Sequence, residues 1–257
     1  MFTQAKQAFL FALMFLTRLP VGRWVMKPEA DTATRAVYFY PLVGLVIGVI
    51  LAAAAIVMSG LGVLLASALL LCLWVVITGA LHLDGLADCM DAYYAGHKHT
   101  HPEERRKRIL SVMHDPSCGA VALVSLVLLL LVKFAALASL NAGWQAALAL
   151  LVAPLLARTA ILPFVALSEY ARYGGKVPDT LSTNSQRLWL ISLLVTALML
   201  LVLGWVNTAV LVACVFALLL YWRRLWHNQI GGYTGDCLGA LVELSEALVL
   251  IVLVALW

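Results

Sequence analysis

Three carboxylates with helical spacing lie between two long apolar stretches of the sequence. They are Asp84, Asp88 and Asp91, spaced four and three residues apart. At about 100° per residue, they fall within an arc of about 60° on one helical face and span about 10 Å. Ionised carboxylates that face one another repel, and oxygen-only ligands favour Mg²⁺ or Mn²⁺ over zinc. This face therefore predicts a metal site that holds a polyphosphate. His82 lies about 160° from Asp84 on such a helix, which favours a structural histidine.

A glycine-rich loop precedes the last apolar stretch and is a second candidate for substrate binding. It runs from Gly231 through Gly232, Thr234 and Gly235 to Asp236. Glycines let backbone N–H groups approach phosphate oxygens, and a helix N-terminus adds a favourable dipole. We expect Gly232, Thr234 and Gly235 to contact substrate and Asp236 to complete the metal site or orient the nucleophile. The alternative for Asp236 is a plain helix cap.

Three further residues are candidates with competing interpretations. Asp115 precedes Pro116, which disfavours helix, so its side chain either reaches the acidic centre as a catalytic group or caps the next helix. Arg158 lies inside an apolar stretch and needs an anionic partner, for which a substrate phosphate is preferred over a carboxylate. Arg18 is either a phosphate contact or an anchor at the membrane interface.

The composition requires a membrane to position these residues. The chain has 257 residues, of which 64% are hydrophobic, and its mean hydropathy is +0.99. A soluble domain would be about half apolar. Segments close to the length that crosses a core of about 30 Å are residues 40 to 59, 61 to 82, 119 to 140, 145 to 167, 188 to 206, 207 to 222 and 238 to 256. We expect an all-α bundle of six or seven transmembrane helices forming one catalytic domain over residues 1–257.

The opening segment and the loop charges predict how the bundle sits in the membrane. Residues 5–19 are apolar but short, which favours an interfacial or re-entrant helix. If seven spans alternate, the loop lysines and arginines all lie on one side, which is cytoplasmic by the positive-inside rule. The net charge of +4 reflects this bias and does not argue for a nucleic-acid partner, because no aromatic-interleaved basic region accompanies it.

Three motifs resemble those of the cobalamin synthases, also called adenosylcobinamide-GDP ribazoletransferases. The first is Thr78-Gly79-Ala80-Leu81-His82-Leu83-Asp84-Gly85-Leu86-Ala87-Asp88, the second is His114-Asp115-Pro116, and the third is Gly232-Tyr233-Thr234-Gly235-Asp236-Cys237-Leu238-Gly239-Ala240. The opening Phe15-Leu16-Thr17-Arg18-Leu19-Pro20 and the chain length also fit. The resemblance therefore covers essentially the whole chain.

The resemblance implies a multi-pass enzyme of the bacterial inner membrane with a cytoplasmic active site. Its substrates would be adenosylcobinamide-GDP and α-ribazole or α-ribazole 5′-phosphate, with release of GMP and a requirement for Mg²⁺. Together with the shared helical faces, it favours Asp84 and Asp88 as metal ligands, Asp91 as metal ligand or base, and Asp236 as completing the site. Two kinds of protein partner are left open: a second copy of this chain in a homo-oligomer, and soluble enzymes of the same pathway that dock on it.

Two other functions compete with this interpretation. A CDP-alcohol phosphotransferase usually carries D-x-x-D-G-x-x-A-R, but Asp84-Gly85 is followed by Leu-Ala-Asp without the arginine. An ion-coupled transporter would line a pathway with intramembrane charges such as Arg158 and Lys133. Against a transporter, the two halves of the chain do not repeat, and the acidic groups gather on one side of the membrane.

Overall fold

A computed structural model describes residues 2–26, 32–140, 143–171 and 185–257, and the chain there is almost entirely helical. The α-helices in these ranges are α1 (Phe2–Leu16), α2 (Thr32–Ala36), α3 (Tyr40–Val57), α4 (Val63–Thr78), α5 (Leu81–Gly96), α6 (Pro102–Val112), α7 (Ala120–Ser139), α8 (Trp144–Leu167), α10 (Ser185–Ile230) and α11 (Gly235–Leu256), with 3₁₀ turns at Gly22–Trp24 and Val37–Phe39. Extended pairing among these residues is limited to one isolated bridge between Tyr170 and Tyr233. The all-α prediction is confirmed.

Several helices are suited to cross a membrane, which confirms a multi-pass membrane protein. Among the described residues, five helices are long and apolar enough to span, or up to six if the bent pair α4 and α5 forms one span. This count takes α10 as one helix of 46 residues. Helix α1, with 15 residues, is shorter than a span and packs its buried face, which includes Leu13 and Leu16, into the core.

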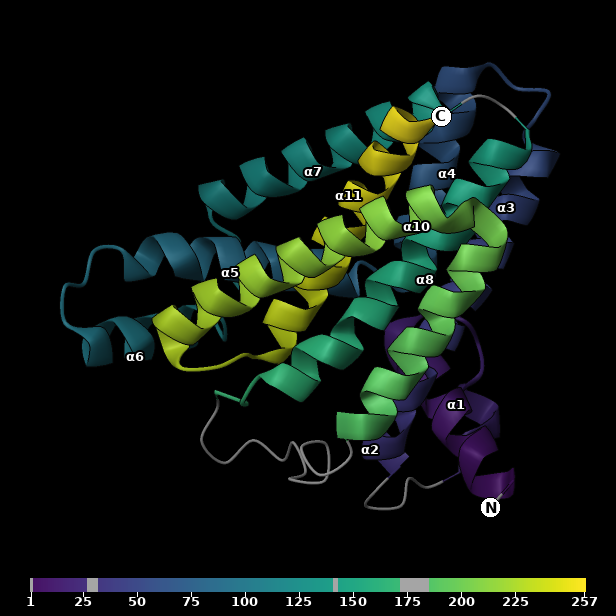
Figure 1. The fold of residues 1–257 in the computed structure, drawn as a ribbon. Helices are drawn as coiled ribbons and strands as arrows, with labels where there is room; N and C mark the ends of the chain where they lie inside the picture. The colour runs from purple at the N-terminus through teal and green to yellow at the C-terminus, as the bar shows by residue number, and fades with distance from the viewer. Residues whose placement is uncertain (1, 27–31, 141–142, 172–184) are drawn as a thin grey trace.

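The long element α10 is divided at Gly204. This residue has φ 77° and ψ 170°, which is not helical, and φ in this region suits glycine because it has no Cβ. Figure 1 shows the chain folding back at this bend, so that the two arms of α10 run in different directions. The sequence predicts two spans that meet between residues 206 and 207, and the structure places their boundary two residues earlier.

A sharp bend separates α4 from α5 and changes the setting of the acidic helix. Gly79 and Ala80 both adopt left-handed backbone conformations, with φ of 62° and 58°, and the two helices are bent by 87°. For alanine this conformation costs about 1–2 kcal/mol, so the surrounding packing must hold it. The predicted span over residues 61–82 therefore ends at Thr78. The acidic residues lie on a separate helix that turns away from it, rather than at the mouth of a continuous span.

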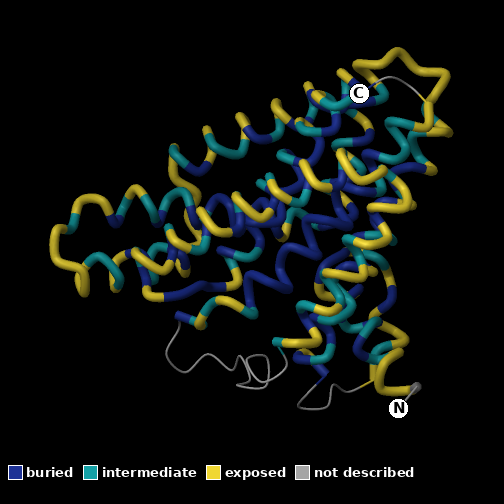
Figure 2. Tube along the Cα trace, viewed as in Figure 1, coloured by how far each residue is buried: buried dark blue, intermediate teal, exposed yellow. Residues whose placement is uncertain are grey.

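Helices α8 and α11 form the centre of the bundle. Figure 2 shows their traces mostly in the colour of buried residues, while the outer helices carry long exposed stretches. Helix α3 packs closely on α8 through Gly44 and Gly48: a Cβ at Gly44 would collide with the backbone of Pro154, and one at Gly48 with that of Leu151. Small residues four apart let two membrane helices approach closely. This contact fixes α8, and α8 supports the site described next.

Candidate functional site

A cavity of about 350 Å³ opens between α5, α8, α11 and the N-terminal segment. Asp84 from α5 and Asp236 from α11 both line it. Asp84 is exposed, and Asp236 lies in the first turn of its helix. The structure thus brings together one carboxylate from each of the two acidic motifs, which are about 150 residues apart in the sequence.

Small residues hold α5 against α11 at the level of these carboxylates. A Cβ on Gly85 would lie 2.8 Å from the backbone oxygen of Asp236, and one on Gly239 would lie 3.3 Å from the Cα of His82. One turn further along, the thiols of Cys89 and Cys237 lie close enough to interact across the same contact. Gly85 and Gly239, one from each motif, therefore serve helix packing, and this packing sets the separation of Asp84 and Asp236.

Thr234 begins α11 and holds Asp236 in place. Its hydroxyl oxygen accepts a hydrogen bond from the Cys237 N–H at 3.4 Å and donates to Asp236 Oδ2 at 3.2 Å. Thr234 is fully buried, so it supports the carboxylate rather than facing substrate directly. The alternative interpretation of Asp236 as the helix cap does not hold, because Thr234 is the cap.

The two predicted phosphate-contacting glycines have different surroundings. Gly235 lines the cavity, and no atom lies within 4 Å of the position that a Cβ would take, so a ligand has room to approach its backbone. Gly232 instead packs against the backbone of Glu169, beside the bridge in which Tyr233 N–H donates to Glu169 O at 2.9 Å. Gly232 therefore has a role in loop packing, and its contact with substrate stays a prediction.

The remaining carboxylates of α5 have separate roles. Asp88 is half-buried, and both it and Asp236 lie close enough to the Cys89 thiol to interact with it electrostatically. Asp91 accepts backbone hydrogen bonds from Gly119 at 2.5 Å and from Ala122 at 3.0 Å, and so caps the start of α7. Each of its oxygens thus already accepts one amide hydrogen bond, and a role of Asp91 as metal ligand or base stays a prediction.

Two other predicted residues lie outside the cavity wall. Asp115 accepts hydrogen bonds from the backbone N–H and hydroxyl of Ser117, at 3.0 and 2.7 Å, and these bonds lower the pKa of its carboxyl group. It stabilises its own exposed turn instead of capping α7 or reaching the acidic residues. Arg18 is exposed, and its side chain covers Gly79 at the bend between α4 and α5. The backbone N–H of Arg18 donates a hydrogen bond to the backbone oxygen of Ile77 at 2.7 Å.

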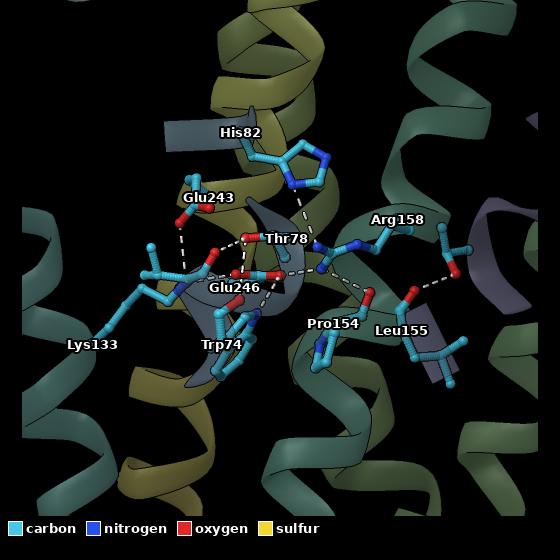
Figure 3. Close-up of polar contacts among 11 residues, drawn as sticks. Trp74, Thr78, His82, Lys133, Pro154, Leu155, Arg158, Glu243 and Glu246 are labelled. Carbon is cyan, nitrogen blue, oxygen red and sulfur yellow. Dashed lines mark hydrogen bonds and ion pairs between the residues drawn. The ribbon is translucent and has the colours of Figure 1, made fainter. Parts of the chain in front are cut away.

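Arg158 belongs to a buried network of two acids and two bases, which Figure 3 shows. Its guanidinium donates to Glu246, which also accepts from Lys133 at 2.6 Å, and Lys133 in turn donates to Glu243 at 3.0 Å. The four side chains are at most 4% exposed. The preferred prediction of a substrate phosphate therefore gives way to the alternative, since a carboxylate 88 residues away in sequence supplies the anionic partner.

His82 connects this buried network to the cavity. Its Nδ1 lies 3.4 Å from Arg158 Nη2, and the residue is only 3% exposed. Figure 3 draws this contact as a dashed line. It also lines the cavity. A structural histidine was expected, and the contact with Arg158 supports that expectation for Nδ1. The helical spacing predicts that His82 and Asp84 lie on nearly opposite faces of α5. Both residues nevertheless line the same cavity.

Comparison with known proteins gives the family. The family model described as cobalamin-5-phosphate synthase matches residues 8–254. The chain belongs to this family. A relative from Pseudomonas aeruginosa strain PAO1 is 44% identical over 254 residues, which are 97% of this chain and 98% of the relative. One from Pseudomonas fluorescens strain Pf0-1 is 42% identical over 93% of this chain and 96% of its own. Both are named adenosylcobinamide-GDP ribazoletransferase, and no solved structure matches the chain.

For this member of the family, the carboxylates do not form a ready-made metal cluster. Within the described ranges, no group of three or more His, Cys, Asp or Glu side chains converges closely enough to hold a metal ion. The predicted set of Asp84, Asp88, Asp91 and Asp236 is therefore not assembled as one cluster. Asp84 and Asp236 nevertheless offer oxygen ligands to one cavity, and Mg²⁺ in phosphate-handling sites is usually held by one or two carboxylates plus substrate oxygens.

The cavity also contains residues that the sequence interpretation did not single out. Tyr40 and Tyr170 line it beside Tyr233, and burial together with Tyr170 raises the pKa of Tyr233 to about 12, so its phenol is neutral. Tyr233 lies inside the glycine-rich motif, which was a usable signal. The sequence gives no such signal for Tyr40 and Tyr170, because each lies in a different part of the chain and only the fold brings them together.

Proposed function

We propose that this membrane enzyme joins adenosylcobinamide-GDP to α-ribazole or its 5′-phosphate, giving adenosylcobalamin or its 5′-phosphate and GMP. Relatives that carry the name of this transferase match 93% or more of the chain. The observation that carries the proposal is the cavity that Asp84 and Asp236 share. It supplies two carboxylates beside an open glycine backbone, which suits a diphosphate group.

The reaction is a displacement at phosphorus. A ribose hydroxyl of ribazole attacks the phosphoryl group attached to cobinamide, a new P–O bond forms, and the P–O bond to GMP breaks, so that GMP leaves with the electron pair. The hydroxyl must lose its proton during this attack. Asp236 is the carboxylate we assign to accept that proton, because it lines the cavity and the hydrogen bond from Thr234 fixes its position there.

Asp84 and Asp88 lie one helical turn apart on α5 and would hold Mg²⁺ together with oxygens of the diphosphate. Their donor set is oxygen-only, which fits a hard divalent cation. The ion would neutralise the negative charge of the diphosphate and of the departing GMP. The chain's own contribution is to fix α5 against α11 through Gly85 and Gly239, so that Asp84 and the proton acceptor Asp236 line the same cavity.

We place the enzyme in a bacterial inner membrane with the cavity open to the cytoplasm. The support is the positive charge of the loops, since Arg105, Arg106, Lys107 and Arg108 of α6 follow the acidic helix α5 directly in the chain. Cytoplasmic loops carry the excess of lysine and arginine in membrane proteins. Protease accessibility of α6 in oriented inner-membrane vesicles tests this orientation: inside-out vesicles expose it and right-side-out vesicles protect it.

The test of the proposed function is release of GMP by the purified protein in liposomes. With adenosylcobinamide-GDP, α-ribazole and Mg²⁺ we expect equal amounts of GMP and the joined corrinoid, and with EDTA we expect neither product. A carrier would move one of these compounds across the bilayer and release no GMP. Absence of GMP release with both substrates and Mg²⁺ present would contradict the proposal.

A further inference from the structure

The cavity extends beyond its two carboxylates, and most of its wall is apolar. Its lining comes from α1, α2, α5, α8 and α11 and from the residues around them. The apolar part includes Leu16, Val37, Ile161, Val165 and Leu238. The charged groups of the lining are Asp84 and Asp236, on the α5 and α11 side. A substrate with one apolar end and one polar reacting end fits a cavity with this division.

The apolar part contains an aromatic wall. Tyr170 and Tyr233 are arranged edge to face, with ring centroids 5.5 Å apart and an interplanar angle of 76°. Phe164 packs edge to face on Tyr233, with ring centroids 5.7 Å apart, and Tyr233 is 3% exposed, so this ring is fixed. Tyr40 adds a third ring to the lining. Fixed aromatic rings favour a flat aromatic ligand through stacking or edge contacts.

The volume of the cavity selects between the two substrates. About 350 Å³ lies near the lower end of the range of small-molecule sites, about 300–1,000 Å³. A nucleoside with a bicyclic base fits this size, whereas a corrin macrocycle with its amide side chains is several times larger. The corrinoid must therefore stay outside the cavity, with only its diphosphate reaching the carboxylates.

His82 supplies a buried polar group at the wall of this space. Arginine only donates hydrogen bonds, so the contact with Arg158 Nη2 makes His82 Nδ1 an acceptor and leaves the ring proton on Nε2. Nε2 is buried and has no hydrogen-bond partner within the protein. Figure 3 shows the ring turned from α5 toward the space between α8 and α11, with Nδ1 facing Arg158. A buried donor without a partner is destabilising, and a hydrogen-bond acceptor on a ligand would remove that cost.

We propose that this cavity is the subsite for the acceptor, an aromatic nucleoside of the ribazole type. Its benzimidazole base lies against Tyr40, Tyr170 and Tyr233, its ribose faces Asp84 and Asp236, and His82 Nε2 donates a hydrogen bond to it. This inference rests on the proposed function and adds to it which substrate enters the cavity. It also makes His82 a binding residue in addition to a structural one.

The test measures KM for each substrate separately, with the other one saturating, for protein in liposomes. Tyr233→Leu removes the ring, and His82→Asn keeps an acceptor near Arg158 but removes the Nε2 donor. We expect each to raise the KM for α-ribazole about tenfold or more, and the KM for adenosylcobinamide-GDP to change less than twofold. His82→Gln places an amide N–H near the Nε2 position and should recover part of the loss. The matched control is Tyr221→Leu, at a residue that is 64% exposed on α10, and both KM values should stay unchanged.

The outcomes separate this inference from the proposed function. If the KM for adenosylcobinamide-GDP rises while that for α-ribazole does not, the cavity binds the other substrate and the inference is overturned. If neither KM moves in folded variants, the cavity holds something else, such as a lipid acyl chain, and the inference is again overturned. Should Tyr233→Leu fail to fold, Tyr170→Leu gives the same comparison. Wild-type protein that releases no GMP would instead count against the proposed function.

Discussion

Substitution of Glu246 by glutamine is the sharpest test of the buried network in the bundle. Glu246 accepts hydrogen bonds from both Arg158 and Lys133, and the indole N–H of Trp74 also donates a hydrogen bond to it at 3.3 Å. Glu246→Gln keeps the size of the side chain but removes one of two negative charges, so Glu243 is left as the one acid facing two buried cations. The network changes from neutral to a net charge of about +1.

The expected loss of stability is about 3 kcal/mol. Removing one partner of a buried ion pair costs about 3–5 kcal/mol, and a single charge at the centre of a bilayer costs about 2.5–3.5 kcal/mol on insertion scales. The lower part of the first range is appropriate here, because the amide oxygen of glutamine still accepts a hydrogen bond from one of the two cations. Glu243→Gln is the milder comparison, since Glu243 contacts only Lys133 in this network, and we expect a smaller loss.

Reversible unfolding by SDS in mixed micelles, followed by tryptophan fluorescence, measures these differences. The double variant Arg158→Met with Glu246→Gln restores neutrality and leaves Lys133 paired with Glu243, so it should be more stable than Glu246→Gln alone. A loss below about 1 kcal/mol for Glu246→Gln, or a double variant whose losses simply add, would refute the reasoning that these charges stabilise one another.

Three further predictions concern the α5 face and its neighbours. Gly85→Ala should abolish most GMP release, because its methyl group would push against the backbone of Asp236, whereas Gly235→Ala meets no atom within 4 Å and should leave the thermal unfolding temperature unchanged. Unchanged turnover in Gly85→Ala would contradict the packing argument. Asp91→Ala should lower stability by about 1 kcal/mol through loss of the α7 cap, while KM for both substrates stays the same, as measured by unfolding and kinetics. Asp115→Asn should keep full turnover at pH 7, since its carboxylate bonds only its own turn, and a large loss of kcat would show a role in the reaction.

Hydropathy was sufficient to predict the membrane architecture, but it was insufficient to predict the bend that positions the acidic helix. Long apolar segments must be helical in a bilayer, so α3, α7, α8 and α11 agree with their predicted spans within a few residues. The bend between α4 and α5 depends on Ala80 in a left-handed conformation, which alanine avoids on its own. Tertiary packing imposes this conformation on Ala80, and no local sequence pattern predicts it.

Helical periodicity placed the acidic residues on one face without giving their partners. Asp84, Asp88 and Asp91 do share a helix, but α7 begins close to Asp91 and takes its carboxylate as a cap. Arg158 has a strong requirement for an anion, yet the choice between substrate and Glu246 depends on the register of α8 against α11. Contacts between residues 88 positions apart follow from that register, which the sequence of one helix does not contain.

The most direct measurement is the rate of GMP release by Asp84→Asn and Asp236→Asn at saturating Mg²⁺ and substrates. The central claim is that these two carboxylates, brought to one cavity by α5 and α11, carry out the transfer. Each variant should insert and unfold like the wild type, since asparagine is isosteric, but release GMP at least about 100-fold more slowly. Near wild-type release by Asp84→Asn or by Asp236→Asn would contradict the claim for that carboxylate, and near wild-type release by both would overturn the account of the site.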